Sequence, residues 1–479
     1  MLKMLSEAEF ARRTAGGCRT PVYREFLADR ETPVAVLTRV VDDESVFLLE
    51  SVAGGERPGR YSYLGIDPAK VLVAANGEDP LAKAKEALYG QPFSPAPELP
   101  SFQGGVIGYV AYDAVGFFEP HVRLSAEAGT PSSQFLVTDT VVILDHVRQS
   151  ALVVRVVGVK AGETASEVYV RTMKEIETLQ ERLLSAESIT RYMERRKNEG
   201  GRLGPFTPEM SEAEFEDIVS SCKDAIRAGE VIQIVPSQKF TAETDISALD
   251  LYRALRMVNP SPYNFFLKSG GRALIGSSPE ELVKLEGRRA TTAPIAGTRP
   301  RGSNPDVDKM LETELLADEK ERAEHVMLVD LGRNDLGRVS KIGSVRVDDY
   351  ARVERYSHVM HLVSDVSGEL RDDCDAFDLL RATFPAGTLT GAPKVRAMEL
   401  LAGLEKSPRG VYGGVVGYFS YTGDMDFAIV IRTMMLKDGL LAMRAGAGIV
   451  ADSDPAREYH ETLNKCKAVF DAARYAAEL

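Results

Sequence analysis

Two pairs of glutamates lie at helical spacing in distant parts of the chain. Glu321 and Glu324 fall within 305–331, where the sequence predicts a helix, and Glu458 and Glu461 fall near the C-terminus. Residues three apart on a helix have neighbouring side chains, so each pair would place two carboxylates side by side. Carboxylates crowded on an apolar face need a cation or a proton to offset their charge. If the two helices faced each other, their acids could hold one hard divalent ion, for which Mg²⁺ is the natural candidate.

Both pairs also have an ordinary explanation as solvated helix surfaces. Glu321 precedes His325 by four residues, and Glu461 precedes Lys465 by four, which is the separation of ion pairs along a helix. A C-terminal helix is expected in either case, because Asp454, followed by a proline, suits an N-cap. The spacing alone leaves metal binding and a solvated surface as alternatives.

Other groups could bind an anionic ligand. Arg432 is expected inside the apolar strand FAIVIRTM, where a guanidinium needs an anionic partner from the protein or from a ligand. The glycines of RAGAG (444–448) would let a ligand approach backbone N–H groups, although a tight turn is the simpler explanation. His361, in SHVMHLVS, is either a hydrogen-bonded core residue or a general acid with a pKa near neutrality.

The elements that would carry these residues follow from apolar runs and turn signals. Residues 21–158 contain runs such as VAVLTRVV and TVVILDHV, which are typical of strands. Residues 163–199 are charged and predict a long exposed helix, and the glycines and prolines of 200–210 predict a boundary. Ser211 and Glu214 then have the spacing of a capping box at the start of a helix.

Strands and helices alternate from residue 211 to the C-terminus. The strands come in runs, over 263–293 and 411–450. Such runs favour antiparallel sheets with helices packed on them, the α+β class.

Composition excludes several classes of protein. The 479-residue chain has a formal net charge of −13, which argues against nucleic acid as the main partner, because phosphate binding needs a basic surface. Its four cysteines form no CxxC pair, so neither a disulfide framework nor a zinc site is expected, and a cytoplasmic location fits. The N-terminus lacks the apolar core of a signal peptide, and no apolar run is long enough to cross a membrane.

A set of motifs, spread over most of the chain in a fixed order, resembles the chorismate-utilising enzymes and, among them, component I of anthranilate synthase. No single motif is specific, but the set is. The motifs are LLES (48–51), GRYSYLG (59–65), IQIVPSQKF (232–240), NPSPYNFFL (259–267), PIAGTRPRG (294–302), AEHVMLVDLGRNDLGRV (323–339), VMHLVS (359–364), FPAGTLTGAPK (384–394), YGGVVGY (412–418), IVIRTM (429–434), GAGIVADSDP (446–455) and ETLNK (461–465).

The resemblance implies a fold and a division into domains. The fold would be α+β, with packed antiparallel β-sheets and helices on the outside, in α/β/β/α layers. A regulatory domain that senses tryptophan would cover residues 20–160, a helix and linker 161–210, and a chorismate-binding catalytic domain 211–470.

The resemblance also implies the residues of an active site. Glu324 and Glu461 would hold Mg²⁺, and Glu321 and Glu458 would act on the ion through water or through the ligating groups. The other implied residues are the substrate contacts Gly297, Thr298, Tyr412, Arg432, Gly446, Ala447, Gly448 and Lys465, and the catalytic residues His361, Thr388 and Gln233.

Two positions separate the subfamilies. Relatives that add water to chorismate have a lysine base where this chain has Gln233, and relatives that make aminodeoxychorismate have a nucleophilic lysine where it has Ala296. The absence of both lysines fits ammonia as the external nucleophile. The implied reaction, of the lyase class, converts chorismate and ammonia to anthranilate and pyruvate through aminodeoxyisochorismate, as the first committed step of tryptophan biosynthesis.

The resemblance further implies a partner and an inhibitor. None of the cysteines lies in a GxCxG context typical of a nucleophile, so a separate glutamine amidotransferase subunit, component II, would supply the ammonia within a heterotetramer. Tryptophan would inhibit by feedback. Its pocket would include Glu50, Ser51, Pro262, Tyr263 and Asn264, where Asn264 replaces the family's usual Met.

Three other functions remain as alternatives. Component I of aminodeoxychorismate synthase uses the same substrate, but Ala296 argues against it. An enzyme that stops at aminodeoxyisochorismate is disfavoured by His361. A non-catalytic, tryptophan-sensing paralogue is disfavoured because Glu324, Arg432 and Glu461 are all present.

Overall fold

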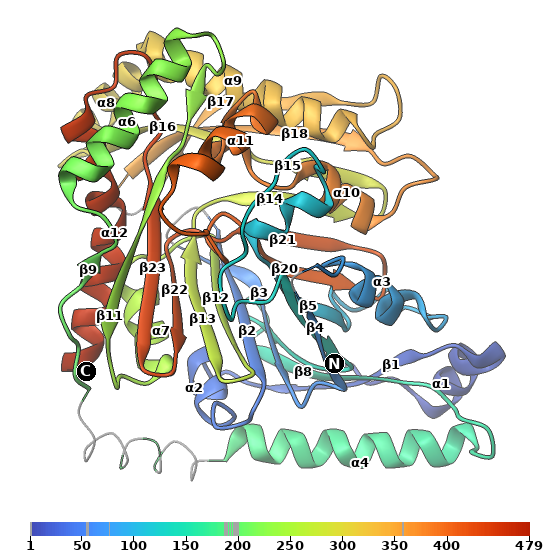
Figure 1. Ribbon diagram of the computed structural model, residues 1–479. Helices are drawn as coiled ribbons and strands as arrows, with labels where there is room; N and C mark the ends of the chain where they lie inside the picture. Colours follow the sequence, from blue (N-terminus) through green and yellow to red (C-terminus); the bar gives the residue numbers. More distant parts are fainter. Residues whose placement is uncertain are drawn as a thin grey trace.

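Two large antiparallel β-sheets pack against each other at the centre of the molecule, with helices around them (Figure 1). This computed structural model describes every residue except 1, 54–56, 76, 186–189, 191, 193, 195–200 and 357–358. Aromatic rings meet between the sheets: the ring centroids of Tyr63 and Tyr418 lie 6.1 Å apart, and that of Phe102 lies 4.3 Å from Tyr418. The α+β fold with packed antiparallel sheets, expected from the sequence, is confirmed.

The first sheet has eleven strands in the order β1-β8-β7-β3-β2-β12-β13-β22-β23-β11-β9. Each strand runs antiparallel to its neighbours. The strands are β1 (Thr20–Leu27), β2 (Val46–Ala53), β3 (Arg57–Ile66), β7 (Thr140–Asp145), β8 (Ser150–Val157), β9 (Thr207–Pro208), β11 (Ser237–Glu243), β12 (Tyr263–Ser269), β13 (Arg272–Ser278), β22 (Thr433–Lys437) and β23 (Leu440–Gly446).

The second sheet has ten strands, of which nine follow the order β16-β18-β15-β14-β21-β20-β5-β6-β4 and one, β17, pairs with β18. They are β4 (Lys70–Ala74), β5 (Gly105–Val110), β6 (Ser133–Thr138), β14 (Glu281–Glu286), β15 (Arg289–Thr292), β16 (Ile295–Pro300), β17 (Arg346–Arg355), β18 (Val359–Glu369), β20 (Val415–Ser420) and β21 (Met425–Ile429). A two-stranded ribbon, β10 (Gln233–Ile234) with β19 (Gly391–Ala392), lies beside them in the fold.

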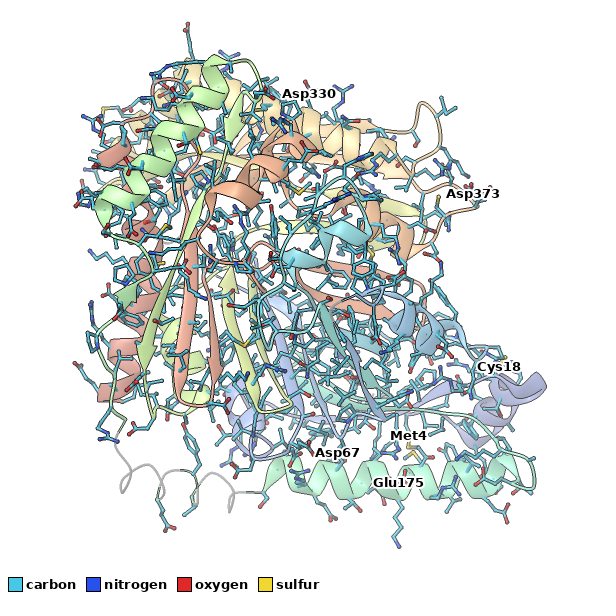
Figure 2. The ribbon with its side chains drawn as sticks, viewed as in Figure 1. Met4, Cys18, Asp67, Glu175, Asp330 and Asp373 are labelled. Atoms are coloured by element: carbon cyan, nitrogen blue, oxygen red, sulfur yellow. The ribbon has the colours of Figure 1, made fainter. Side chains whose placement is uncertain are left out.

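Helices cover the outer sides of the sheets. The α-helices are α1 (Glu7–Thr14), α2 (Pro33–Thr38), α3 (Ala82–Tyr89), α4 (Ala165–Leu184), α6 (Glu212–Arg227), α7 (Ala248–Val258), α8 (Pro305–Ala317), α9 (Glu319–Gly337), α10 (Ala376–Thr383), α11 (Lys394–Leu404) and α12 (Pro455–Glu478), and the 3₁₀ turns are η1 (Ala15–Gly17), η2 (Tyr112–Phe117) and η3 (Gly387–Leu389). Helix α12 packs on α7, α6 and β23, and α9 packs on β16 and β18. Helix α4 runs along β1 and β8 at the bottom of the view, where Glu175 forms an ion pair with Arg155 of β8 at 2.9 Å (Figure 2).

The helix boundaries follow their capping residues. Ser211 and Glu214 form the expected capping box at the start of α6, and Asp454 caps α12 as expected. The single helix expected over 305–331 is wrong: the chain breaks at Asp318, whose extended backbone ends α8 and whose carboxylate caps α9. An aspartate competes with the backbone for hydrogen bonds and therefore favours a cap over a helix interior.

The strands of 20–160 and of 211–470 share both sheets. Strand β2 pairs with β12 in the first sheet, and β5 pairs with β20 in the second. The expected division into domains stays a prediction. Of the expected linker and long helix, α4 ends at Leu184, and residues 186–189, 191, 193 and 195–200 lie outside the described residues. No helix in the described ranges is both long and apolar enough to cross a membrane.

Candidate active site

A cavity of about 440 Å³ lies where α9, α12, β16, β18 and the end of β23 meet. It collects residues that are far apart in the sequence. The expected site residues that line it are Gln233, Gly297, Thr298, Glu321, Glu324, His361, Thr388, Tyr412, Arg432, Gly446, Gly448, Glu461 and Lys465. We call it the central cavity.

Carboxylates from two helices face this cavity. Glu321 and Glu324 come from α9, and Glu461 comes from α12. Burial, together with the neighbouring Glu324, raises the pKa of Glu321. Glu458 lies one turn before Glu461 and is not among the residues that line the cavity; burial raises its pKa, and the carboxylate of Glu461 adds to the effect. Three of the four glutamates, from two separate helices, therefore face one cavity.

The carboxylates of the cavity fit a hard cation whose remaining ligands come from water and a substrate. Within the described part of the chain, no three His, Cys, Asp or Glu side chains gather closely enough to hold a metal ion by themselves. Glu324 and Glu461 line one cavity, and carboxylate oxygens are the ligands that Mg²⁺ prefers. Because Mg²⁺ commonly uses one or two carboxylates together with water and substrate oxygens, the two residues suffice as the protein's share.

Arg432 brings a half-buried positive charge to the same cavity. The expectation that it lies inside a strand is wrong: it sits between β21 and β22 with φ of +51°, a left-handed conformation that interrupts the strand. Burial lowers the pKa of its guanidinium. Among the described residues, none forms a hydrogen bond or an ion pair with that guanidinium. A half-buried guanidinium that lines a cavity and has no protein partner is suited to an anionic ligand.

His361 is held by the backbone of β16. Its Nδ1 lies 2.9 Å from the carbonyl oxygen of Gly297 and 3.1 Å from Oγ1 of Thr298. Burial lowers the pKa of the imidazole, so the ring is neutral at neutral pH. A carbonyl oxygen can only accept, so Nδ1 carries the hydrogen and Nε2 is left with a lone pair. The side chain is therefore arranged as a proton acceptor.

Glu280 is a further candidate for a functional residue, which the sequence motifs did not single out. It lines the central cavity directly before β14, and its Oε1 accepts a hydrogen bond from Oγ1 of Thr388 at 2.8 Å. Burial raises the pKa of its carboxyl to about 7, although Thr388, Lys465 and Arg432 act in the opposite direction. The signal in the sequence was the pair of acids in SPEEL at the start of an otherwise apolar strand, where an acid needs a reason to be buried.

The glycines of 446–448 bring backbone close to the cavity wall. A Cβ at Gly446 would lie 2.6 Å from the carbonyl oxygen of Pro236, and one at Gly448 would lie 2.9 Å from Nε2 of Gln233. Ala447 is not among the lining residues, and its amide donates to Pro236 O at 3.1 Å, so its expected substrate contact stays a prediction. Lys465 Nζ donates to Gly446 O at 3.0 Å and lies 3.5 Å from Glu461.

A second cavity, of about 420 Å³, lies between β2, β3 and β12 of one sheet and β14, β20 and β21 of the other. Of the expected tryptophan pocket, Glu50, Ser51, Tyr263 and Asn264 line it, and Pro262 is not among its lining residues. Strand pairing brings these residues together, because Tyr263 lies opposite Ser51 and Asn264 opposite Glu50.

The polar groups of the second cavity are largely engaged with the protein. Asn264 is buried; its Nδ2 donates to Ser261 O at 3.0 Å, and its Oδ1 accepts from Ser277 Oγ at 2.7 Å. Asp426, by contrast, lines the cavity with a buried Oδ1 that has no hydrogen-bond partner among the described atoms. A ligand with both an apolar body and a hydrogen-bond donor would suit such a pocket.

The chain is similar to known proteins over nearly its whole length. The model of the family described as chorismate binding enzyme matches residues 44–471. Anthranilate synthase component 1 of Acetivibrio thermocellus is 43% identical over 96% of this chain and 96% of its own, and that of Pseudomonas aeruginosa is 43% identical over 99% of each. The crystal structure of anthranilate synthase component I from Streptococcus pneumoniae superposes with a TM-score of 0.75 at 40% identity, over 86% of this chain and 92% of that one.

Proposed function

Because this chain belongs to the chorismate binding enzymes, we propose that its central cavity converts chorismate and ammonia to anthranilate and pyruvate, a lyase reaction. One observation carries the proposal. Glu324 and Glu461, from two separate helices, face a single cavity that also contains the guanidinium of Arg432. A ring compound with two carboxylates would meet a cation-binding side and a cationic side in this cavity.

The walls of the cavity suggest how such a dianion would bind. Arg432 and Lys465 would receive the enolpyruvyl carboxylate, because both cations line the cavity. Glu324 and Glu461 would hold Mg²⁺ at the ring carboxylate, with Glu321 and Glu458 acting through water or through the ligating groups. Bound there, Mg²⁺ would act as a Lewis acid that stabilises negative charge in the ring as the hydroxyl leaves.

Glu280 would supply the proton for the first step. With a pKa of about 7, its carboxyl keeps a proton over much of the neutral range. As the nitrogen of ammonia bonds to C2 and the ring double bonds shift, the C4–O bond breaks, and Glu280 would protonate the departing oxygen to give water. Thr388 would orient the carboxyl through its hydrogen bond to Oε1.

His361 would accept the proton in the second step. The neutral imidazole, with Nδ1 bonded to Gly297 O, has its Nε2 lone pair available. Removal of the C2 proton, breakage of the C3–O bond and protonation of the released enolpyruvate at its methylene carbon would give anthranilate and pyruvate. This assignment rests on the tautomer that the Gly297 carbonyl requires.

Ammonia would come from a partner subunit. The relatives are named component 1, a name that belongs to one part of a larger enzyme. We infer a glutamine amidotransferase as the partner, because ammonia at neutral pH is mostly ammonium and a hydrolysed amide delivers the free base.

The second cavity would bind tryptophan as a feedback inhibitor. It lies apart from the central cavity, has aromatic and aliphatic walls, and contains Glu50, Ser51 and the unpartnered Oδ1 of Asp426, which could receive an α-amino group. A buried carboxylate favours a cationic donor in such a place.

The reaction is tested by mixing the purified chain with chorismate, Mg²⁺ and an ammonium salt and following the fluorescence of anthranilate together with the release of pyruvate. Anthranilate and pyruvate in equal amounts are expected. Formation of the para isomer would assign the chain to aminodeoxychorismate synthesis, and no aromatic product would favour a non-catalytic, tryptophan-sensing role.

A further inference from the structure

A buried guanidinium lies directly behind the central cavity. Arg409, on the segment between α11 and β20, has a side chain that is 1% exposed. Its Nε donates to Oε2 of Glu405 at 2.8 Å, and its Nη2 donates to Oε1 of the same carboxylate at 2.7 Å. A buried ion pair is weak evidence for stability, because desolvation of both charges is costly, so its other contacts decide what it does.

The remaining donors of Arg409 hold backbone that forms the cavity wall. Nη1 donates to the carbonyl oxygen of Leu389 at 2.6 Å, and Nη2 donates to that of Val235 at 2.7 Å. Both of these residues line the central cavity. Leu389 follows Thr388 in the turn η3, so the bond to Leu389 O fixes the turn from which Thr388 reaches Glu280.

The flat face of the same guanidinium supports a third part of the wall. It lies 4.5 Å from the ring centroid of Tyr112 and 5.7 Å from that of Tyr412. Tyr412 lines the cavity, and a Cβ added to Gly446 would lie 3.1 Å from its hydroxyl. Arg409 thus contacts segments that reach the cavity from η3, from the residues before β11 and from the residues before β20.

We propose that Arg409 is a positioning residue that fixes these three wall segments relative to one another, so that Thr388 keeps Glu280 in the orientation used for proton transfer. The guanidinium uses four N–H donors in a planar fork while stacking on two rings. A lysine keeps the charge but has three donors on one nitrogen and no flat face, so it cannot make this set of contacts.

Arg409→Lys tests the proposal, which rests on the proposed function where turnover is the readout. Misplacement of a reacting group by about 1 Å can cost about 100-fold, so kcat is expected to fall by about 10- to 100-fold, while KM for chorismate changes little. The hydrogen bond from Thr388 lowers the pKa of Glu280, so weakening that bond raises this pKa. Activity should then decline at a higher pH than in wild type. Thr388→Val is expected to shift this decline in the same direction.

Glu405→Gln is the matched control. It removes the same buried ion pair and lowers the melting temperature, but it leaves the Arg409 bonds to Leu389 and Val235 available. This variant should keep kcat within a few-fold of wild type, and its activity should decline at the same pH as in wild type. If Glu405→Gln loses as much kcat as Arg409→Lys, or if Arg409→Lys turns over like wild type, Arg409 is a structural residue and the proposal is wrong.

Amide hydrogen exchange gives a readout that does not depend on the reaction. In Arg409→Lys, exchange should increase at the amides of η3 and of residues 233–235. It should increase much less there in Glu405→Gln, because the side chain of Glu405 accepts instead from the amide of Ser237 at 2.8 Å. Equal increases in the two variants would overturn the positioning role. A wild-type chain that does not convert chorismate would refute the proposed function, and this comparison of exchange would still decide the role of Arg409.

Discussion

Glu280 and Glu281 are neighbours in the chain, yet Glu280 lines the central cavity and Glu281 is hydrogen-bonded to a residue of the second. Glu280 lines the central cavity and accepts a hydrogen bond from Thr388 at 2.8 Å. Glu281 accepts a hydrogen bond from the hydroxyl of Tyr263 at 2.7 Å, and Tyr263 lines the second cavity. Glu281 is the first residue of β14 and Glu280 directly precedes that strand, so one peptide bond joins a residue of the central cavity to a residue that contacts the wall of the second.

Loss of feedback is expected when the second cavity is filled. Ser51→Leu should weaken inhibition by tryptophan strongly while leaving turnover without tryptophan little changed, because Ser51 lines the second cavity and not the central one. Inhibition curves for wild type and variant, at one chorismate concentration, check this. Unchanged inhibition in the variant would place the tryptophan site elsewhere.

Loss of either facing carboxylate should impair catalysis. Glu324→Gln and Glu461→Gln are each expected to lower kcat/KM by about 100-fold or more, even at excess Mg²⁺, because each would remove a charged metal ligand. Glu458→Gln is the control: it lies one turn away, outside the cavity lining, and its effect should be smaller. Steady-state assays over a Mg²⁺ titration measure all three, and near wild-type turnover in Glu324→Gln or Glu461→Gln would contradict the metal assignment.

The raised pKa of Glu280 predicts a pH dependence of stability. The folded-state pKa of about 7 lies above the ordinary value of 4.5, so the folded state binds the proton more tightly than the unfolded state does. The contribution of this group is therefore fully present below about pH 4.5 and is lost as the pH rises through 7. Glu280→Gln cannot ionise, so its melting temperature should gain on that of wild type between pH 5 and pH 8. A constant difference over this range would show that Glu280 titrates normally.

Two neighbouring glycines should differ in their tolerance of a methyl group. Gly446→Ala would bring a Cβ to 2.6 Å from a backbone oxygen, that of Pro236, which cannot move without shifting the strand. Gly448→Ala would meet the end of the Gln233 side chain, at 2.9 Å, which can rotate away. We expect about 1–3 kcal/mol of destabilisation and a clear loss of kcat for Gly446→Ala, and less for Gly448→Ala. Chemical denaturation and turnover assays on the pair decide the order.

The source of nitrogen gives a test of the partner. The purified chain should form anthranilate with ammonium salts and none with glutamine, because none of its four cysteines lies in the GxCxG context of an amidotransferase nucleophile. Cys222 and Cys466 are also buried, and burial raises the pKa of each thiol to about 12. Since free ammonia is the nucleophile, the rate at a fixed ammonium concentration should rise with pH until Glu280 loses its proton. Glutamine-dependent turnover by the chain alone would refute the need for a second subunit.

The sequence predicted local features well where a single residue determines them. The caps at Ser211 and Asp454 are where their side chains predicted. The spacing of the glutamates only raised the possibility that α9 and α12 face each other, and the structure brings Glu324 and Glu461 to one cavity. Strand pairing of Ser51 with Tyr263 could not be read from the sequence, because register between distant strands depends on the whole sheet.

The misses have physical causes as well. Asp318 divides a region with helical composition, because capping a new helix satisfies its carboxylate better than continuing the old one does. Arg432 lies in an apolar run, yet its left-handed backbone takes it out of the strand and aims the guanidinium at the cavity. The signal for Glu280 was limited to the pair of acids in SPEEL, since its raised pKa comes from burial, which only the packed structure reveals.

The sharing of both sheets between early and late strands restricts how this protein can change over evolutionary time. Deletion of residues 20–160 would remove β2 from its pairing with β12 and β5 from its pairing with β20. The remaining part of each sheet would then have a long unpaired edge strand. A descendant that has lost feedback inhibition is therefore expected to retain the whole N-terminal segment and to differ by single substitutions around the second cavity.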